Sequence, residues 1–338
     1  MKTNSRRMPL NRLAGFAMLS LAAFACAFSS SPGQAQPAGD WPQRPITLLV
    51  PIAAGGGTDI IARAVAAELA PVLGQPIVVK NQPGANGTIG TAAVARDPAD
   101  GYTIMVGSIG THAANVCLYD LPYDAEKDFT PVAQLAKYNN VFIVPNDSPI
   151  TSLPDLVERA KAQPDKLTYA ITVIGSSSHL AIEKFKLDAG IELLGVPYNG
   201  AVPATVDLMG GRIDFMLDTV VSQYGRIAAG KVRVLATTMS SARSSVLPDV
   251  KTVAEQGYPQ FDTVGWTGLF VRSGTPEPIV NKIADALTSV YATGKLQKLL
   301  GSKGLDVETT TPKDFARFVA KERKTWCDVI KASDIKVS

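Results

Sequence analysis

The chain has 338 residues, a hydrophobic share of 46% and a formal net charge of +3. Four positive charges, at Lys2, Arg6, Arg7 and Arg12, lie in the first 35 residues, so the remainder is slightly acidic. That remainder shows no pattern of Lys and Arg gathered on one face, which excludes a typical nucleic-acid-binding surface, and we expect no nucleic-acid partner. Its length suffices for two domains with separate cores.

Residues 1–35 are typical of an export signal. The basic residues precede an apolar stretch, Leu13–Phe28, that is too short and Ala-rich for a membrane span, and small residues for a signal peptidase follow at Gly33 and Ala35. We predict cleavage near Ala35 and a periplasmic location. A twin-arginine signal at Arg6 and Arg7 and a lipidated Cys26 are alternatives whose usual sequence patterns are incomplete.

Short apolar runs alternate with helical patterns along the rest of the chain. The expected strands are Ile46–Val50, Ile77–Val79, Tyr102–Val106, Leu167–Ile171, Leu193–Pro197, Asp214–Leu217 and Val232–Thr237. Between them, apolar residues recur three and four positions apart, as on one face of a helix. This alternation predicts an α/β protein whose parallel sheets are covered by helices.

Two segments with the same pattern indicate the domain layout. Val141–Ala160 and Gly268–Leu287 each contain an apolar strand, a turn with proline and an amphipathic helix. We interpret them as the places where the chain leaves one domain and returns to it. The prediction is a discontinuous first domain, 40–138 plus 265–338, with a second domain inserted at 139–264. Two unrelated strands in one large sheet are the alternative.

The turn in "VPIAAGGGTDIIAR", Val50 to Arg63, is the strongest candidate for a binding site. Glycine lets the backbone approach a ligand closely, and a helix beginning near Thr58 directs unpaired N–H groups and partial positive charge at the same place. We predict an anion site on the backbone of residues 53–58, with Asp59 as a structural cap. The spacing does not match the GxxxxGK[ST] phosphate loop of nucleotide-binding proteins.

Two further turns of the first domain follow predicted strands. The Asn81–Gly90 turn fits an ordinary structural turn and a ligand loop equally well. The Gly107–Asn115 turn contributes side chains that can donate hydrogen bonds to a carboxylate, at Ser108, Thr111 and His112. Both turns are therefore expected near the same ligand.

In the second domain, Gly175 and three serines, Ser176–Ser178, lead directly into a helix. A helix cap needs only one such hydroxyl, so the run indicates a ligand-binding turn. Tyr198, Asn199 and Asp218 lie at the ends of the next predicted strands and are expected beside it.

Catalysis is the less favoured interpretation. A serine nucleophile needs a base within hydrogen-bond reach, yet Ser178 and its neighbour His179 point different ways at a helix start, and no GxSxG motif is present. The histidines and cysteines lack metal-ligand spacing, so we expect neither a metal nor a cofactor. After the signal, Cys117 and Cys327 remain. They permit one disulfide in an oxidising compartment, and two free thiols fit equally well.

Several motifs in one order carry a family resemblance: "WPQRPITLLVPIAAGGGTDIIAR", "NQPGANGTIG", "DGYTIMVGSIGTHAAN", "LPYDAEKDFTPVAQL", "GSSSHLAIEKF", "VPYNGAVPATVDLMGGRIDFMLD" and "GTPEPIVNKI". The chain resembles the Bug-type extracytoplasmic solute receptors of tripartite tricarboxylate transporters. The resemblance implies an α/β, two-domain periplasmic-binding-protein fold (Venus flytrap, type II) with a parallel-rich sheet in each domain and two crossover strands. It implies a monomer that captures a small organic acid and delivers it to membrane permease subunits. A stand-alone ligand sensor would share these features.

The resemblance also carries over a set of ligand-binding positions: Ile52, Ala53, Ala54, Gly55, Gly56, Gly57, Thr58, Asn81, Gly84, Ser108, Thr111, His112, Ser176, Ser177, Ser178, Tyr198, Asn199, Ala204 and Asp218. Two positions depart from the family pattern. Many relatives have an aromatic residue at Ile52 and a lysine at Asn199, which changes the pocket wall and removes a positive charge. The identity of the acid, aliphatic or aromatic, therefore stays open.

Overall fold

The computed structural model describes residues 40–239, 244, 246–302, 304–307, 309–332 and 335, and one compact unit begins at Trp41. The predicted signal peptide and its cleavage site lie outside the described residues. None of the helices that these residues form combines the length and the hydrophobicity needed to cross a membrane.

The first lobe is built on a six-stranded sheet. Its strands follow the order β11–β4–β10–β3–β1–β2. Their bounds are β1 (Ile46–Val50), β2 (Ile77–Asn81), β3 (Thr103–Ser108), β4 (Phe129–Tyr138), β10 (Gly265–Arg272) and β11 (Leu305–Asp306). Strand β1 pairs in parallel with β2 and β3, whereas β10 runs antiparallel to β3 and β4, and β11 antiparallel to β4.

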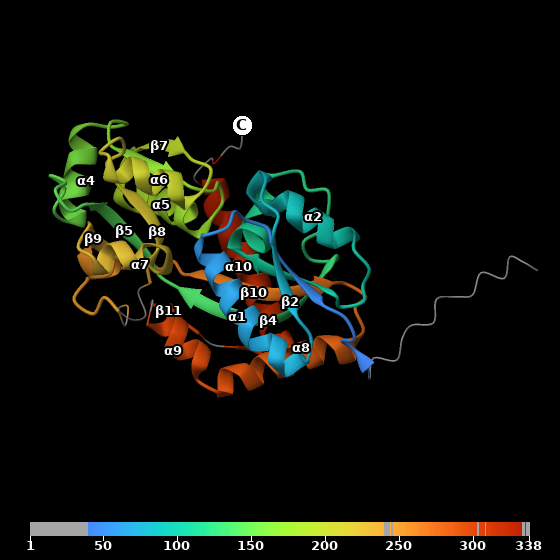
Figure 1. The fold of residues 1–338 in the computed structure, drawn as a ribbon. Coiled ribbons are helices and arrows are strands. Elements are labelled where there is room, and N and C mark those ends of the chain that lie inside the picture. The colour runs from blue at the N-terminus through green and yellow to red at the C-terminus, as the bar shows by residue number, and fades with distance from the viewer. Residues whose placement is uncertain are drawn as a thin grey trace, which may run out of the picture. The chain divides into compact units, whose positions relative to one another are not determined.

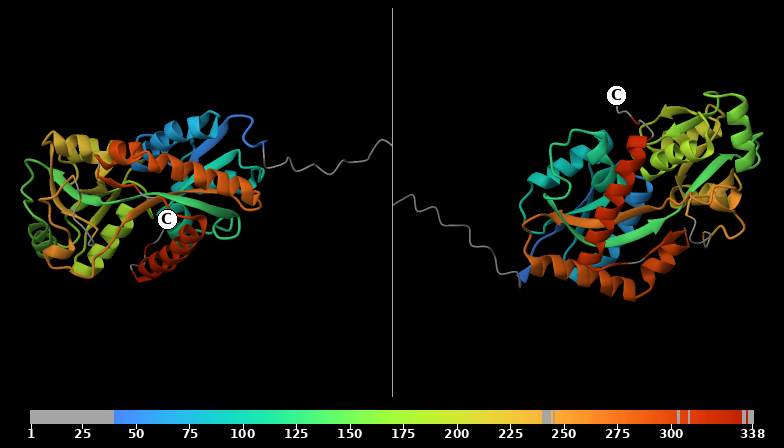
Figure 2. Two further views of the ribbon diagram at one scale, coloured as in Figure 1. Left: turned by 90° about the horizontal axis from the view of Figure 1, so that it is seen from below. Right: turned by 180° about the vertical axis from the view of Figure 1, so that it is seen from behind.

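Helices cover both faces of this sheet. Figure 2 shows α1 (Gly57–Leu73) and α8 (Glu277–Ala292) on one face and α10 (Pro312–Ala332) on the other. The remaining helical segments of this lobe are η2 (Ala85–Gly87), α2 (Thr88–Arg96), η3 (Gly110–Ala114), α3 (Asn115–Leu118) and α9 (Lys295–Gly301).

The second lobe contains two smaller sheets. Strand β5 (Asn140–Pro145) lies between β8 (Met216–Thr219) and β9 (Val232–Thr237) and is antiparallel to both, while β6 (Thr168–Ile171) pairs in parallel with β7 (Leu194–Pro197). The helices of this lobe are α4 (Leu153–Ala162), α5 (Ser177–Ala189), α6 (Ala201–Met209) and α7 (Val220–Ala228), with a short turn at η4 (Ala254–Gln256). Figure 1 shows these elements side by side, away from β1 to β3.

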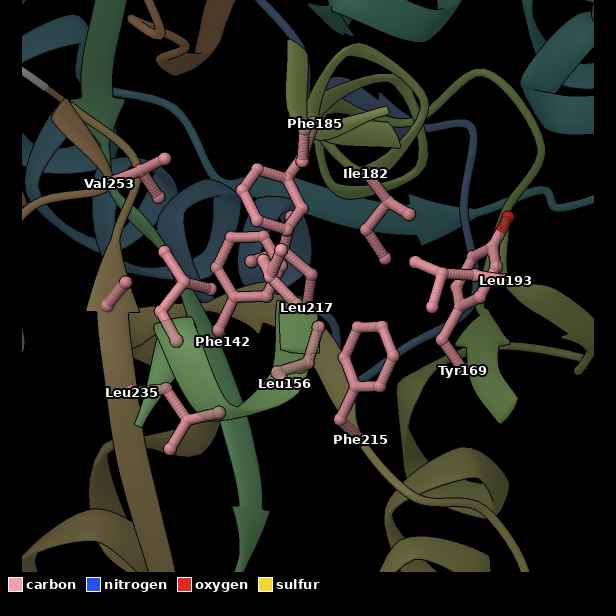
Figure 3. Packing of buried hydrophobic residues seen from close by; sticks show 14 of the residues in the cluster. Phe142, Leu156, Tyr169, Ile182, Phe185, Leu193, Phe215, Leu217, Leu235 and Val253 are labelled. Carbon is pink, nitrogen blue, oxygen red and sulfur yellow. The ribbon is translucent and has the colours of Figure 1, made fainter. Parts of the chain in front are cut away.

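Aromatic residues fill the core of the second lobe. Phe142 from β5, Phe185 from α5 and Phe215 before β8 are fully buried and point toward one another (Figure 3). The Phe142 ring centroid lies 5.1 Å from that of Phe185 and 6.2 Å from that of Phe215. Burying one such side chain stabilises the fold by about 1.5–3 kcal/mol, so this cluster fixes the place of α5 on the sheets.

Local sequence determines where the helices begin and end. The Ser152 side chain accepts a hydrogen bond from the Asp155 N–H at the start of α4, and the Ser176 side chain accepts one from the His179 N–H at the start of α5. Gly74 ends α1 with a left-handed φ of 71°, a conformation that glycine adopts without a steric penalty.

The expected strands are all present, with ends shifted by at most two residues, and the α/β class is confirmed. The expectation of parallel-rich sheets is wrong, because both main sheets are mixed or antiparallel. The reason is the crossing between lobes: β4 leads out of the first sheet into β5, and β10 brings the chain back in the opposite direction. Strands β4 and β11 were not predicted.

The path of the chain from one sheet to the other also indicates the domain layout. Strands from residues 46–138 and 265–306 share one sheet, whereas strands from residues 140–237 form the other two. Strands β5 and β10 therefore do not lie in one large sheet. This distribution supports the proposed boundaries, with 139–264 as the inserted domain.

A disulfide joins Cys117 in α3 to Cys327 in α10, with Cα atoms 5.5 Å apart and a sequence separation of 210. Both ends belong to the first lobe. The bond therefore ties the segment after β3 to the C-terminal helix, and the whole second lobe lies in the chain between them.

Removing this bond by Cys117→Ser should lower the free energy of unfolding by about 2–4 kcal/mol, because a long loop in the unfolded chain is no longer closed. Urea denaturation measures the loss. Cys327→Ser and the double variant should lose the same amount, since each change breaks the same bond. A double variant as stable as the wild type, or two free thiols in the denatured, unreduced protein, would contradict this prediction.

Candidate functional site

A buried carboxylate shapes the turn after β1. The Asp59 carboxylate accepts hydrogen bonds from the Gly55 N–H (2.9 Å), the Asn81 amide (2.9 Å) and the Arg63 guanidinium (3.0 Å). Burial alone would raise the pKa of Asp59, but the bonds from Arg63, Gly55 and Asn81 hold it below its ordinary value. Asn81 also donates to the Ile52 carbonyl, so this network fixes the path of the turn.

A cavity of about 160 Å³ opens beside this turn, and we call it the small cavity. The first-lobe residues that line it are Ile52, Ala53, Ala54, Gly56, Gly57, Thr58, Asn86, Ser108, Ile109, Gly110 and Tyr138. The second-lobe residues that line it are Thr172, Val173, Ser176, Ser177, Ser178, Asn199, Gly200, Ala201, Val202, Pro203, Asp218 and Thr219. Both lobes therefore form its wall.

Helix N-termini converge on the small cavity. Its lining includes the first residues or caps of α1, α5, α6 and α7. The first N–H groups of a helix have no partner within the helix, and the helix dipole places partial positive charge there. Because the described lining contains no Lys, Arg or His, these backbone groups are its main source of positive potential.

Hydroxyl groups supplement the backbone donors. Tyr138 lines the cavity at the end of β4, near Ser177 of the second lobe and Thr58 of the first, and burial raises the pKa of Tyr138 to about 12, against the opposing effect of those two hydroxyl groups. Ser176 and Ser178 pair through their hydroxyls at 3.1 Å. Tyr138 thus lies near the starts of both α1 and α5.

Asp218 is the acidic residue of the small cavity. Its carboxylate accepts hydrogen bonds from the Gln223 amide (2.7 Å), the Ser222 hydroxyl (2.5 Å) and the Thr219 N–H (2.8 Å). Burial raises the pKa of Asp218 above its ordinary value of 3.8, although these three bonds act in the opposite direction. The carboxylate is therefore held by the cap and first turn of α7.

A second cavity of about 490 Å³, the large cavity, adjoins the small one. The two share residues of both lobes in their walls: Ile52, Ala53, Asn86, Thr172, Val173, Asn199 and Gly200. Residues that line only the large cavity are Pro51, Pro83, Gly84, Ala85, Gly87, Tyr119, Ile174 and Tyr198.

Glycines allow the lobes to touch around these cavities. A Cβ on Gly57 would lie 2.9 Å from the Thr219 hydroxyl and 3.2 Å from a Val221 methyl group. A Cβ on Gly175 would lie 2.8 Å from the Asn86 amide and 2.6 Å from a Leu118 methyl group. The two lobes are therefore in direct contact on both sides of the site, as in a closed receptor.

Comparison with known proteins identifies the family. A model of the tripartite tricarboxylate transporter family receptor matches residues 61–335. The chain belongs to this receptor family. Protein BugT of Bordetella pertussis is 33% identical over 92% of this chain and 96% of its own length. These matches confirm the Bug-type resemblance.

Solved structures of relatives share the fold of the receptor. Rpa4515 of R. palustris, solved with adipate, is 36% identical with a TM-score of 0.84 and covers 88% of this chain and 99% of its own. MatC of Rhodopseudomonas palustris, solved with malate, is 36% identical with a TM-score of 0.79 and covers 86% of this chain and 100% of its own. The two-domain periplasmic-binding-protein fold is thereby confirmed, and the family is one of solute receptors rather than enzymes.

Several predicted binding residues lie behind the cavity walls of this receptor. The Gly55 N–H and the Asn81 amide are engaged by Asp59, so they shape the opening turn and do not line a cavity. Ala204 is fully buried in the second lobe. These three residues therefore lie behind the residues that form the cavity walls.

Thr111 and His112 are also buried away from both cavities. The His112 ring stacks on Phe270 at 3.7 Å between centroids, and burial, with nearby Arg323, lowers the pKa of His112 to about 3. The Thr111 hydroxyl lies 2.9 Å from the His112 Nδ1 and accepts from the Ser108 N–H. Both residues therefore support the turn that presents Ser108.

The serine and histidine side chains do not have the geometry that a serine hydrolase needs. The His179 Nδ1 accepts a hydrogen bond from the Gly175 N–H at 3.1 Å, and its Nε2 lies 4.0 Å from Glu183. The Ser178 hydroxyl pairs with Ser176 instead. Among the residues that the structure describes, no group of His, Cys, Asp and Glu could hold a metal ion either.

Sequence reasoning missed four polar residues in the wall of the small cavity: Asn86, Tyr138, Thr172 and Thr219. Tyr138 ends β4, the strand that was not predicted. Asn86 lies in the predicted Asn81–Gly90 turn with a left-handed φ of 51°, and its amide donates to Asn115 at 2.5 Å. The Asn86-Gly87 pair in the sequence could have indicated this residue.

The raised pKa of Asp218 predicts a pH dependence of stability. The folded protein holds the Asp218 proton more tightly than the unfolded chain does, so this contribution to stability is present at low pH and lost as pH rises through the folded pKa. We expect the stability of Asp218→Asn relative to wild type to increase between about pH 4.5 and about pH 7, as measured by urea denaturation.

Asp207→Asn is the control for this experiment. The Arg212 guanidinium and the Tyr198 hydroxyl hold the pKa of Asp207 below its ordinary value. Its stability difference from wild type should therefore be nearly constant over the same pH range. A constant difference for Asp218→Asn as well would show that burial does not raise the pKa of Asp218.

Proposed function

We propose that this receptor captures a small organic carboxylate in the periplasm, between its two lobes, and delivers it to the permease subunits of a tripartite tricarboxylate transporter. The observation that carries the proposal is the convergence of helix N-termini from both lobes on the small cavity. The adipate and malate seen in related structures support the same ligand class.

The available donors are sufficient for an acid group. Burying a carboxylate costs several kcal/mol after relaxation, and each hydrogen bond to a charged group returns about 1.5–3 kcal/mol. Two or three donors per carboxylate therefore suffice. The backbone of residues 56–58 and the turn at Ser176–Ser178 supply them from opposite lobes, without a cationic side chain in the described lining.

Donors on both lobes couple binding to closure. A ligand that touches only one lobe gains part of the available hydrogen bonds, whereas contact with both lobes favours the closed arrangement. The rotation would take place at the crossings between β4 and β5 and between β9 and β10. In this proposal the receptor acts as a monomer, and the closed liganded form is the one that the permease receives.

A thermal-shift screen tests the proposed ligand class. We expect at least one of malate, adipate, citrate, benzoate and 3-phenylpropionate to raise the melting temperature, since a ligand at about 100 times its dissociation constant adds roughly 2.7 kcal/mol. Neutral sugars and metal cations at matched ionic strength are the controls. A shift with the controls alone would overturn the proposal.

The Gly57→Val variant tests binding by closure. A side chain at Gly57 meets Thr219 and Val221 of the other lobe, so closure should be obstructed and affinity for the stabilising acid should fall at least about tenfold in calorimetry. Gly225→Val is the matched control, because no atom lies within 4 Å of its added Cβ in α7. Equal affinities for the two variants would remove this contact from the binding mechanism.

A further inference from the structure

We propose that the large cavity receives an aromatic ring carried by the bound acid, so that the preferred ligand is an aryl-substituted monocarboxylate. The inference rests on the proposed function, because it takes the carboxylate to lie in the small cavity. It adds the chemical nature of the group attached to that carboxylate.

The volumes of the two cavities call for an extended ligand. The small cavity holds about 160 Å³, and the adjoining large cavity holds about 490 Å³. A buried cavity of about 150 Å³ is enough to bind one benzene molecule. The small cavity therefore has room for an acid group and a short carbon chain, and the large cavity has room for a ring in addition.

The shared wall determines the path between the cavities. Ile52, Asn86 and Thr172 line both of them. The Asn86 amide is held by Asn115, which keeps this side chain in place at the junction. A short linker between the carboxylate and the ring can pass here.

The large cavity has an apolar and aromatic wall. Pro83, Ile174 and Ile52 supply apolar surface, and Tyr119 and Tyr198 supply aromatic rings. The Tyr198 hydroxyl donates to the Asp207 carboxylate at 2.9 Å, so its proton is already engaged. Aromatic side chains favour a ring partner through offset or edge-on contacts as well as through burial of apolar area.

Charge disfavours a second carboxylate in the large cavity. Its described lining contains no Lys, Arg or His, and the Asp207 carboxylate lies directly behind Tyr198. Two helix N-termini do face it, because Gly87 is the N-cap of α2 and Gly200 is the N-cap of α6. The small cavity, in contrast, has four such helix starts and the serine hydroxyls.

Isothermal titration calorimetry of the full mature protein tests the proposal. We expect 3-phenylpropionate to bind at least about tenfold tighter than propionate and than adipate, because only the first buries a ring in the large cavity. This comparison uses the wild-type protein and does not depend on any variant.

Ile174→Trp should fill the large cavity and reduce the preference for 3-phenylpropionate over propionate at least about fivefold. Val78→Trp is the matched control, since Val78 is 56% exposed on β2 and lines neither cavity. Adipate or malate binding as tightly as 3-phenylpropionate would overturn this inference and leave the proposed function standing. Absence of binding by every carboxylate would overturn both.

Discussion

An acid group enclosed between two protein lobes needs hydrogen-bond donors that are already oriented toward it. In the binding mode proposed for this receptor they come from the starts of α1 and α5, and the described lining contributes no cationic side chain. The nearest arginine of the opening turn, Arg63, is instead paired with Asp59. Its charge holds the shape of the turn, and residues 56–58 at the start of α1 line the cavity.

The same requirement explains the close packing of the lobes. Donors on α1 and α5 can reach one ligand only if the two helices approach end to end, and side chains at Gly57 or Gly175 would prevent this. Tyr138 completes the arrangement, because its hydroxyl lies near both helix starts. Gly265 makes room for that ring, since a Cβ there would overlap it.

The sequence predicted where the helices next to the cavities start better than it predicted which side chains lie around those starts. Glycine and serine runs before amphipathic helices have a local physical cause, so residues 53, 54 and 56–58 and Ser176–Ser178, which line the small cavity, could be named as candidates from the sequence. The burial of His112 under Phe270 depends on β10, more than 150 residues later, and no local pattern reveals it. Tyr138 was missed for a related reason, because β4 lacks the short apolar run of a parallel strand.

The Cys117–Cys327 bond has a consequence for the effect of proteolysis on this receptor. Both cysteines belong to the first lobe, while every residue of the second lobe lies between them in the chain. A single cut in a loop of the second lobe therefore leaves two fragments that stay covalently joined until the bond is reduced. The cleaved molecule therefore keeps both fragments, and a cut in one loop of the second lobe releases neither of them.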